Sequence, residues 1–76
     1  MPILTIDARD YEYDMKSKVI LEAFDSLDSG ERMVFINDND ASDLIQKVEG
    51  ERSGSLDWEP IKESPGQWEA TILKIT

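Results

Sequence analysis

The chain has 76 residues, a formal net charge of −9, and neither cysteine nor histidine. Without cysteine it forms no disulfide and offers no thiolate nucleophile. Without histidine it lacks the usual proton shuttle near neutral pH and the commonest ligand of transition metals. A chain of this length has room for one hydrophobic core. We therefore predict a single domain over residues 1–76 that is not an enzyme and has no catalytic residue, no metal site and no cofactor.

The excess of acidic residues also indicates which partners are suitable. An acidic surface repels the phosphate backbone of nucleic acids and attracts cationic groups, so we expect no nucleic acid and a protein partner that is basic. The segment Met1-Pro2-Ile3-Leu4 lacks the basic stretch and long apolar core of a signal peptide. No apolar stretch approaches the roughly 20 residues that span a bilayer. These features predict a cytoplasmic protein, monomeric by default, that does not bind membranes.

The first predicted elements are a short strand at residues 3–8 and a helix at residues 15–27. Asp14 is a suitable N-cap for this helix, because its carboxylate can accept from free amides of the first turn. The apolar residues that share one helical face are Met15, Val19, Ile20, Ala23, Phe24 and Leu27. Lys16 and Lys18 lie off that face and are predicted to be solvated.

A second strand and a second helix follow. Residues 31–37 contain an unbroken apolar run that is typical of an interior strand. The polar segment Asp38-Asn39-Asp40 then forms a turn that leads into a helix. The apolar positions that repeat at helical spacing are Ala41, Leu44, Ile45 and Val48. Gly50 and the Ser53-Gly54-Ser55 segment are predicted to close this helix.

The last two predicted strands, at residues 56–63 and 68–75, form a hairpin. Pro60 cannot donate a hydrogen bond to a neighbouring strand, so we expect an edge strand or a bulge there. With right-handed crossovers, the order β-α-β-α-β-β places both helices on one face of a mixed four-stranded sheet. The predicted fold class is therefore an α+β two-layer sandwich, with Leu73 and Ile75 on the more exposed face of the sheet.

Several short segments resemble a known family when they are taken in order. They are Leu4-Thr5-Ile6-Asp7-Ala8-Arg9, Phe24-Asp25-Ser26-Leu27, Gly30-Glu31, Asn37-Asp38-Asn39-Asp40, Leu56-Asp57-Trp58 and Pro65-Gly66-Gln67-Trp68. Over nearly its whole length the chain resembles the bacterial and archaeal family known as domain of unknown function 2249. That family is similar in fold to the TusA/SirA-like sulfur carriers, so the resemblance implies a TusA-like fold.

Two departures from these families bear on function. The TusA-like carriers hold a reactive cysteine in a Cys-Pro-x-Pro motif, and here Tyr13 stands at the cysteine while Asp14 and Lys16 stand at the prolines. The histidines that members of the unknown-function family often carry fall on Ser17 and Asn39. Sulfur carriage therefore does not transfer to this chain. The role that the resemblance still implies is that of an accessory of sulfur or redox metabolism, in which the protein itself carries no sulfur.

The first group of candidate binding residues is Arg9, Tyr11 and Tyr13, in the loop that occupies the position of the carriers' active site. Loops between a strand and a helix often carry function, and exposed Tyr and Arg are good anchors for a partner. The alternative interpretation is that the tyrosine rings cover the edge of the sheet, with their hydroxyls in water.

The second group is Asp38, Asn39 and Asp40, at the start of the second helix. Oxygen ligands on alternate residues suit a hard cation such as calcium. However, Asp43 occupies the position at which a calcium loop needs its sharp-turn glycine. We therefore favour a helix cap, in which carboxylates are stabilised by the free amides of the first turn and by the helix dipole.

These observations predict a small non-catalytic interaction or regulatory module that binds through the tyrosine-containing loop. Two alternatives remain open at this point. One is a small-molecule or divalent-cation binding domain that uses Asp38 and Asp40. The other, which only the family resemblance supports, is the non-carrier accessory of sulfur or redox metabolism.

Overall fold

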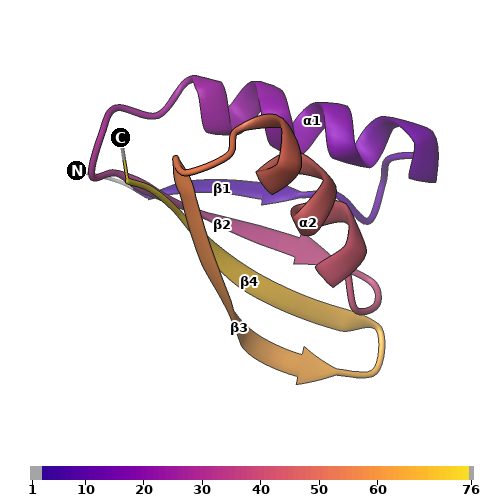
Figure 1. The fold of residues 1–76 in the computed structure, drawn as a ribbon. Helices are drawn as coiled ribbons and strands as arrows, with labels where there is room; N and C mark the ends of the chain where they lie inside the picture. Colours follow the sequence, from indigo (N-terminus) through magenta and orange to yellow (C-terminus); the bar gives the residue numbers. More distant parts are fainter. Residues whose placement is uncertain (1–2, 76) are drawn as a thin grey trace.

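The computed structural model describes residues 3–75 of the chain. Residues 1, 2 and 76, which the single-domain prediction includes, lie outside the described residues. Within residues 3–75 the elements are β1 (Leu4–Asp7), α1 (Tyr13–Asp25), β2 (Arg32–Asn37), α2 (Ser42–Glu51), β3 (Leu56–Ser64) and β4 (Gln67–Lys74). They confirm the predicted element order, and both helices cover the same face of the sheet (Figure 1).

The strands lie in the order β1-β2-β4-β3. β2 runs parallel to β1 and antiparallel to β4, while β3 runs antiparallel to β4. The sheet is therefore mixed, and the predicted α+β fold class is confirmed. β3 lies at one edge, and its pairing with β4 shifts register between Pro60 and Lys62. Both features agree with the expectation that Pro60 sits on an edge strand or beside a bulge.

The hydrophobic core lies between the sheet and the two helices. In the register of β2 and β4, Met33 lies opposite Ile72 and Phe35 lies opposite Ala70. Side chains alternate along a strand, so these four residues all face the helices. The apolar residues with no exposed surface are Ala8, Ile20, Phe24, Met33, Phe35, Ile45, Ala70 and Ile72. Each helix therefore buries a single apolar stripe against the sheet.

Polar side chains close the end of the core near the carboxyl end of α1. The Lys74 ammonium lies 5.3 Å from the centroid of the Phe24 ring, and its Nζ donates to the carbonyl oxygen of Leu27 at 2.8 Å. This bond gives a partner to a backbone carbonyl just beyond α1. Arg52, after α2, forms a two-point pair with Asp25 of α1, with Nη2 and Oδ2 2.7 Å apart. The carboxyl ends of the two helices are thus linked.

The face of the sheet that carries no helix mixes apolar and charged side chains. Leu73 lies on this face, half-buried, opposite Arg32 on β2 and Asp57 on β3. Ile75, just beyond β4, is exposed. Because charged residues flank the apolar ones, this face is compatible with contact with water.

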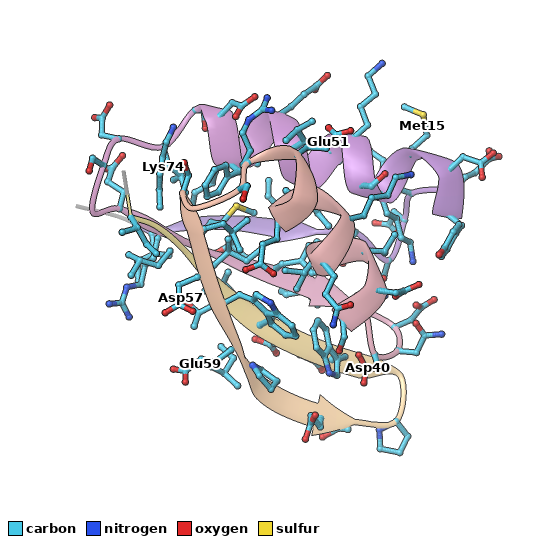
Figure 2. The ribbon with its side chains drawn as sticks, in the orientation of Figure 1. Met15, Asp40, Glu51, Asp57, Glu59 and Lys74 are labelled. Carbon is cyan, nitrogen blue, oxygen red and sulfur yellow. The ribbon has the colours of Figure 1, made fainter. Side chains whose placement is uncertain are left out.

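The amino end of α1 differs from its prediction. The helix begins at Tyr13, so its N-cap is Glu12 rather than Asp14, and Glu12 makes no side-chain capping bond. Met15, predicted to face the core, is 43% exposed and points away from the sheet (Figure 2). Lys16, predicted to be solvated, is only 6% exposed. The reason is helical spacing: position 16 lies one turn before Ile20 on the same face, and the alkyl stem of lysine can be buried there.

Candidate functional site

A polar cleft of about 590 Å³ opens beside the carboxyl end of β2. Its lining residues are Tyr13, Lys16, Asn37, Asp38, Asn39, Asp40, Asp43 and Leu44. Four of the residues predicted to bind, namely Tyr13, Asp38, Asn39 and Asp40, therefore come together in one place. The sequence placed them in two separate loops, and the fold makes those loops neighbours.

The topology explains why the two loops meet. β1 and β2 run parallel, so their carboxyl ends lie at the same edge of the sheet. The chain enters α1 after β1 and α2 after β2, and both helices begin on that side of the molecule (Figure 1). The segments that follow β1 and β2 are therefore neighbours at that edge of the sheet, and residues of both line the cleft.

Lys16 supplies a buried cation at the base of the cleft. Its Nζ donates to Asn37 Oδ1 at 2.6 Å and lies 3.4 Å from Asp38 Oδ1. Asn37, at 2% exposed, is held in turn because its Nδ2 donates to the backbone and side-chain oxygens of Asn39. A lysine ammonium has three donor hydrogens. Within residues 3–75 it meets these two acceptors, which leaves one hydrogen for a further acceptor.

Sequence reasoning missed the role of Lys16, although one signal was present. Lys16 lies four residues before Ile20, which lies four residues before Phe24. Both apolar residues are fully buried. A lysine that continues a buried stripe toward the start of a helix is placed to bury its stem and to present its ammonium near the helix end.

Tyr13 and Asp43 join the first turns of the two helices at the mouth of the cleft. The Tyr13 hydroxyl donates to Asp43 Oδ2 at 3.0 Å. This bond and the negative charge of the carboxylate raise the pKa of Tyr13 above its ordinary value. The Tyr13 hydroxyl is therefore held neutral, as a donor. The side chain is 64% exposed, so a partner can reach it.

Asp40 lies just before the start of α2, whose N-cap is Ala41. Its Oδ1 accepts from the backbone N–H of Ser42 at 2.8 Å and also from the Ser42 hydroxyl. These hydrogen bonds lower the pKa of Asp40, because they stabilise its ionised form. Asp40 thus gives a partner to a free amide at the start of α2, as the sequence favoured, although the N-cap Ala41 itself makes no side-chain capping bond. Within residues 3–75, no group of three or more acidic side chains is arranged to hold a metal ion.

Arg9 and Tyr11, the other two predicted binding residues, lie outside the residues that line the cleft. The Arg9 guanidinium forms a two-point pair with Asp7, with Nε–Oδ1 at 2.9 Å and Nη2–Oδ2 at 2.7 Å. Tyr11 is 46% exposed. The tyrosine-containing loop is thus divided, because only its last member, Tyr13, joins α1 and reaches the cleft.

The pair between Asp7 and Arg9 gives a pH-dependent prediction. Side-chain and backbone hydrogen bonds from Arg9 lower the pKa of Asp7 to about 2. Because the folded-state pKa lies below the unfolded value, this pair favours folding above about pH 4. That contribution is lost as the pH falls toward 2. A carboxyl-carbon NMR titration should give the low pKa for Asp7, and Arg9→Gln should raise it toward about 3.9. An unchanged pKa in that variant, or the same rise in the control Arg52→Gln, would contradict the assignment.

The arrangement of elements defines a class, an α+β domain built on a mixed open sheet. The solution structure of HP1264 from Helicobacter pylori has this fold, with a TM-score of 0.80 over 97% of this chain and 100% of that one. The two sequences are 13% identical, so the similarity concerns the fold alone. The family described as uncharacterized conserved protein (DUF2249) matches residues 5–74, and the chain belongs to this family. No curated protein matches the sequence. None of the helices within residues 3–75 is long and apolar enough to cross a membrane.

Proposed function

We propose that the protein is a small, non-catalytic recognition module that binds a basic group of a protein partner in this cleft. The supporting observation is that the start of α1 and the start of α2 bring Tyr13 and the aspartates of the cleft to one opening. Its lining aspartates, at positions 38, 40 and 43, outnumber the single lysine, Lys16. The resulting negative field favours a cation. We further propose that the protein acts in the cytoplasm, as a monomer.

The bonding of each acidic group in the cleft is compatible with a cationic ligand. An ionised carboxylate can accept about four hydrogen bonds. Asp43 accepts one bond from Tyr13, and Asp40 accepts two from Ser42. Each therefore keeps lone pairs for a guanidinium or an ammonium. The exposed Tyr13 ring adds a surface over which such a cation can lie.

The chemistry of the cleft supports recognition rather than catalysis. A nucleophile or a general base requires a pKa brought toward the working pH. The hydroxyl of Tyr13 has the opposite tendency, because its pKa is raised by Asp43. The Lys16 amine is held by Asn37 and Asp38. These groups can therefore position a ligand through hydrogen bonds and charge.

A small molecule is the second candidate, and Lys16 favours it. The cleft volume lies within the range of about 300–1,000 Å³ that is usual for small-molecule sites. The remaining hydrogen of Lys16 suits a ligand that carries an acceptor oxygen beside its cationic group. An accessory role in sulfur or redox metabolism would use the same opening, since Tyr13 stands at the position where the TusA-like sulfur carriers hold their cysteine.

The recognition proposal predicts that a Tyr13→Ser, Asp43→Ser double variant loses its partner while the domain stays folded. Both side chains are exposed, and together they form the mouth of the cleft. In affinity capture from the host lysate, the variant should capture no more than about one tenth of the partner that the wild type captures, as expected when interface anchors are removed. Tyr11→Ser is the matched control, because Tyr11 is exposed but lies outside the cleft. Thermal melting followed by circular dichroism should show that both variants are folded.

The outcomes separate the candidates. A partner that binds the double variant as well as the wild type rules out the cleft as the binding site. Equal loss in Tyr11→Ser would assign binding to the whole loop instead. Titration calorimetry of chelator-treated protein with calcium and magnesium tests the cation alternative. Heat that appears at millimolar metal and disappears in Asp40→Asn would show that the ligand of the cleft is a metal cation and not a basic partner.

A further inference from the structure

The space between α1 and α2 continues beyond the cleft. A second hollow of about 450 Å³ shares Tyr13, Asp43 and Leu44 with the cleft. A third, of about 210 Å³, shares Ser17 and Lys47 with the second. The three hollows are therefore neighbours that follow one another between the helices along α2, and together they are termed the groove. The Tyr13–Asp43 hydrogen bond crosses this groove near its beginning.

Charges of alternating sign follow the α2 side of the groove. Asp43, Lys47 and Glu51 are spaced four residues apart, so they lie on the same face of the helix. Each lines at least one of the hollows. Glu51 marks the end of α2 farthest from Asp40 (Figure 2). Within residues 3–75 none of these three groove residues forms an ion pair, so all three charges are available to a partner.

The spacing of these charges matches an extended polypeptide. Four residues of an α-helix rise about 6 Å, and two residues of an extended chain advance about 6.6 Å. Alternate side chains of an extended segment therefore fall opposite Asp43, Lys47 and Glu51 in turn. The whole pattern from Asp43 to Glu51 extends about 12 Å along the helix, which four or five extended residues span.

We propose that the groove binds an extended segment of a partner protein whose charges alternate as basic-x-acidic-x-basic. The basic side chains face Asp43 and Glu51, and the acidic one faces Lys47. Lys18 of α1 lines the same hollow as Lys47 and adds a second positive charge for the acidic side chain of the partner. This inference rests on the proposed function and specifies the segment that enters the cleft.

An extended segment fits this groove better than a partner helix does. A helix docks by laying a broad apolar face into an apolar groove. Here the apolar lining is narrow, because Leu21 is half-buried and Leu44 and Val48 are only 5% and 2% exposed. The walls are charged, so the recognition elements are ion pairs in a fixed order. Such an order contributes more to specificity than to affinity.

Two synthetic peptides of identical composition and charge test this order: acetyl-Lys-Ala-Glu-Ala-Lys-amide and acetyl-Lys-Ala-Lys-Ala-Glu-amide. Binding is followed by ¹⁵N chemical shifts of the full chain at about 0.01 M salt, where surface charges are least screened. The first peptide should bind about fivefold more tightly, because its second and third charges meet opposite charges on α2 where those of the other peptide meet like charges. It should shift amides along α2 from Asp43 to Glu51. Lys47→Glu should abolish the preference, whereas Lys62→Glu, an equal charge change on β3, should preserve it.

Equal affinity for the two peptides, or a preference that survives Lys47→Glu, would overturn the proposed charge order. Shifts confined to Tyr13 and Asp40 would mean that the peptide binds in the cleft alone and not along the groove. If neither peptide binds, the segment proposal fails. The proposed function is judged separately, by whether the Tyr13→Ser, Asp43→Ser variant loses its captured partner.

Discussion

Phe24→Ala is expected to destabilise the protein by about 3–5 kcal/mol, as large-to-small changes of a buried phenylalanine do. Phe24 has no exposed surface, and it belongs to the core between the helices and the sheet. A domain of this length usually unfolds with a free energy of roughly 4–11 kcal/mol. The substitution should therefore remove much of the stability. Urea unfolding followed by tryptophan fluorescence measures it, because Trp68 is buried beside Trp58, with ring centroids 6.2 Å apart.

Met15→Ala on the same helix is the matched control for this prediction. Met15 and Phe24 were both expected to face the core, but Met15 is 43% exposed. Its truncation should therefore change the free energy of unfolding by no more than about 0.5 kcal/mol. Equal losses for Met15→Ala and Phe24→Ala would mean that the helix presents a different face to the sheet.

Lys74→Met tests the cation that lies beside Phe24. The substitution should lower the free energy of unfolding by about 1 kcal/mol, because the bond to the Leu27 carbonyl is lost.

Much of the fold could be predicted because the signals for its elements are local. The apolar run from Met33 to Ile36 belongs to β2, which lies between β1 and β4, and such a run is typical of an interior strand. Pro60 indicated an edge strand through a single chemical property, its missing N–H. The helices followed from a period of 3.6 residues. These patterns determine the element order, and right-handed crossovers then place both helices on one face.

The cleft could not be predicted in the same way, because its residues come from distant parts of the chain. Tyr13 and Asp43 are separated by 30 positions, and Lys16 and Asn37 by 21. Periodicity describes one element at a time and contains no information on which loops become neighbours. The parallel pairing of β1 with β2 supplies that information. It also explains why Tyr13 reaches the cleft while Arg9, two residues after β1, pairs locally with Asp7.

Hydropathy misplaced Lys16 for a related reason. A scale that counts lysine as polar places it in water, whereas its stem follows the stripe of Ile20 and Phe24 and only its ammonium needs a polar partner. Asn37 provides that partner at the end of β2. The residue is therefore buried because two elements meet, and that meeting is a tertiary property.

Lys16→Met should destabilise the protein by about 1–3 kcal/mol, the usual cost of leaving a buried polar atom without its partner. Methionine retains most of the buried stem but removes the ammonium. Asn37 Oδ1 then loses its donor in a residue that is 2% exposed. Urea unfolding measures the loss. Lys18→Met, an exposed lysine on the same helix, is the matched control and should change stability by no more than about 0.5 kcal/mol.

The double variant Lys16→Met, Asn37→Leu decides what causes that loss. Burying an ammonium is itself costly, so an apolar residue at position 16 destabilises only if a polar group is left behind. When both partners become apolar, neither leaves the other as an orphaned polar group, and Asn39 is an exposed residue that can bond to water instead. The double variant should therefore recover most of the stability lost in Lys16→Met, giving a coupling energy of about 1 kcal/mol or more. Additive losses would mean that the ammonium of Lys16 stabilises the fold independently of Asn37, through its pair with Asp38.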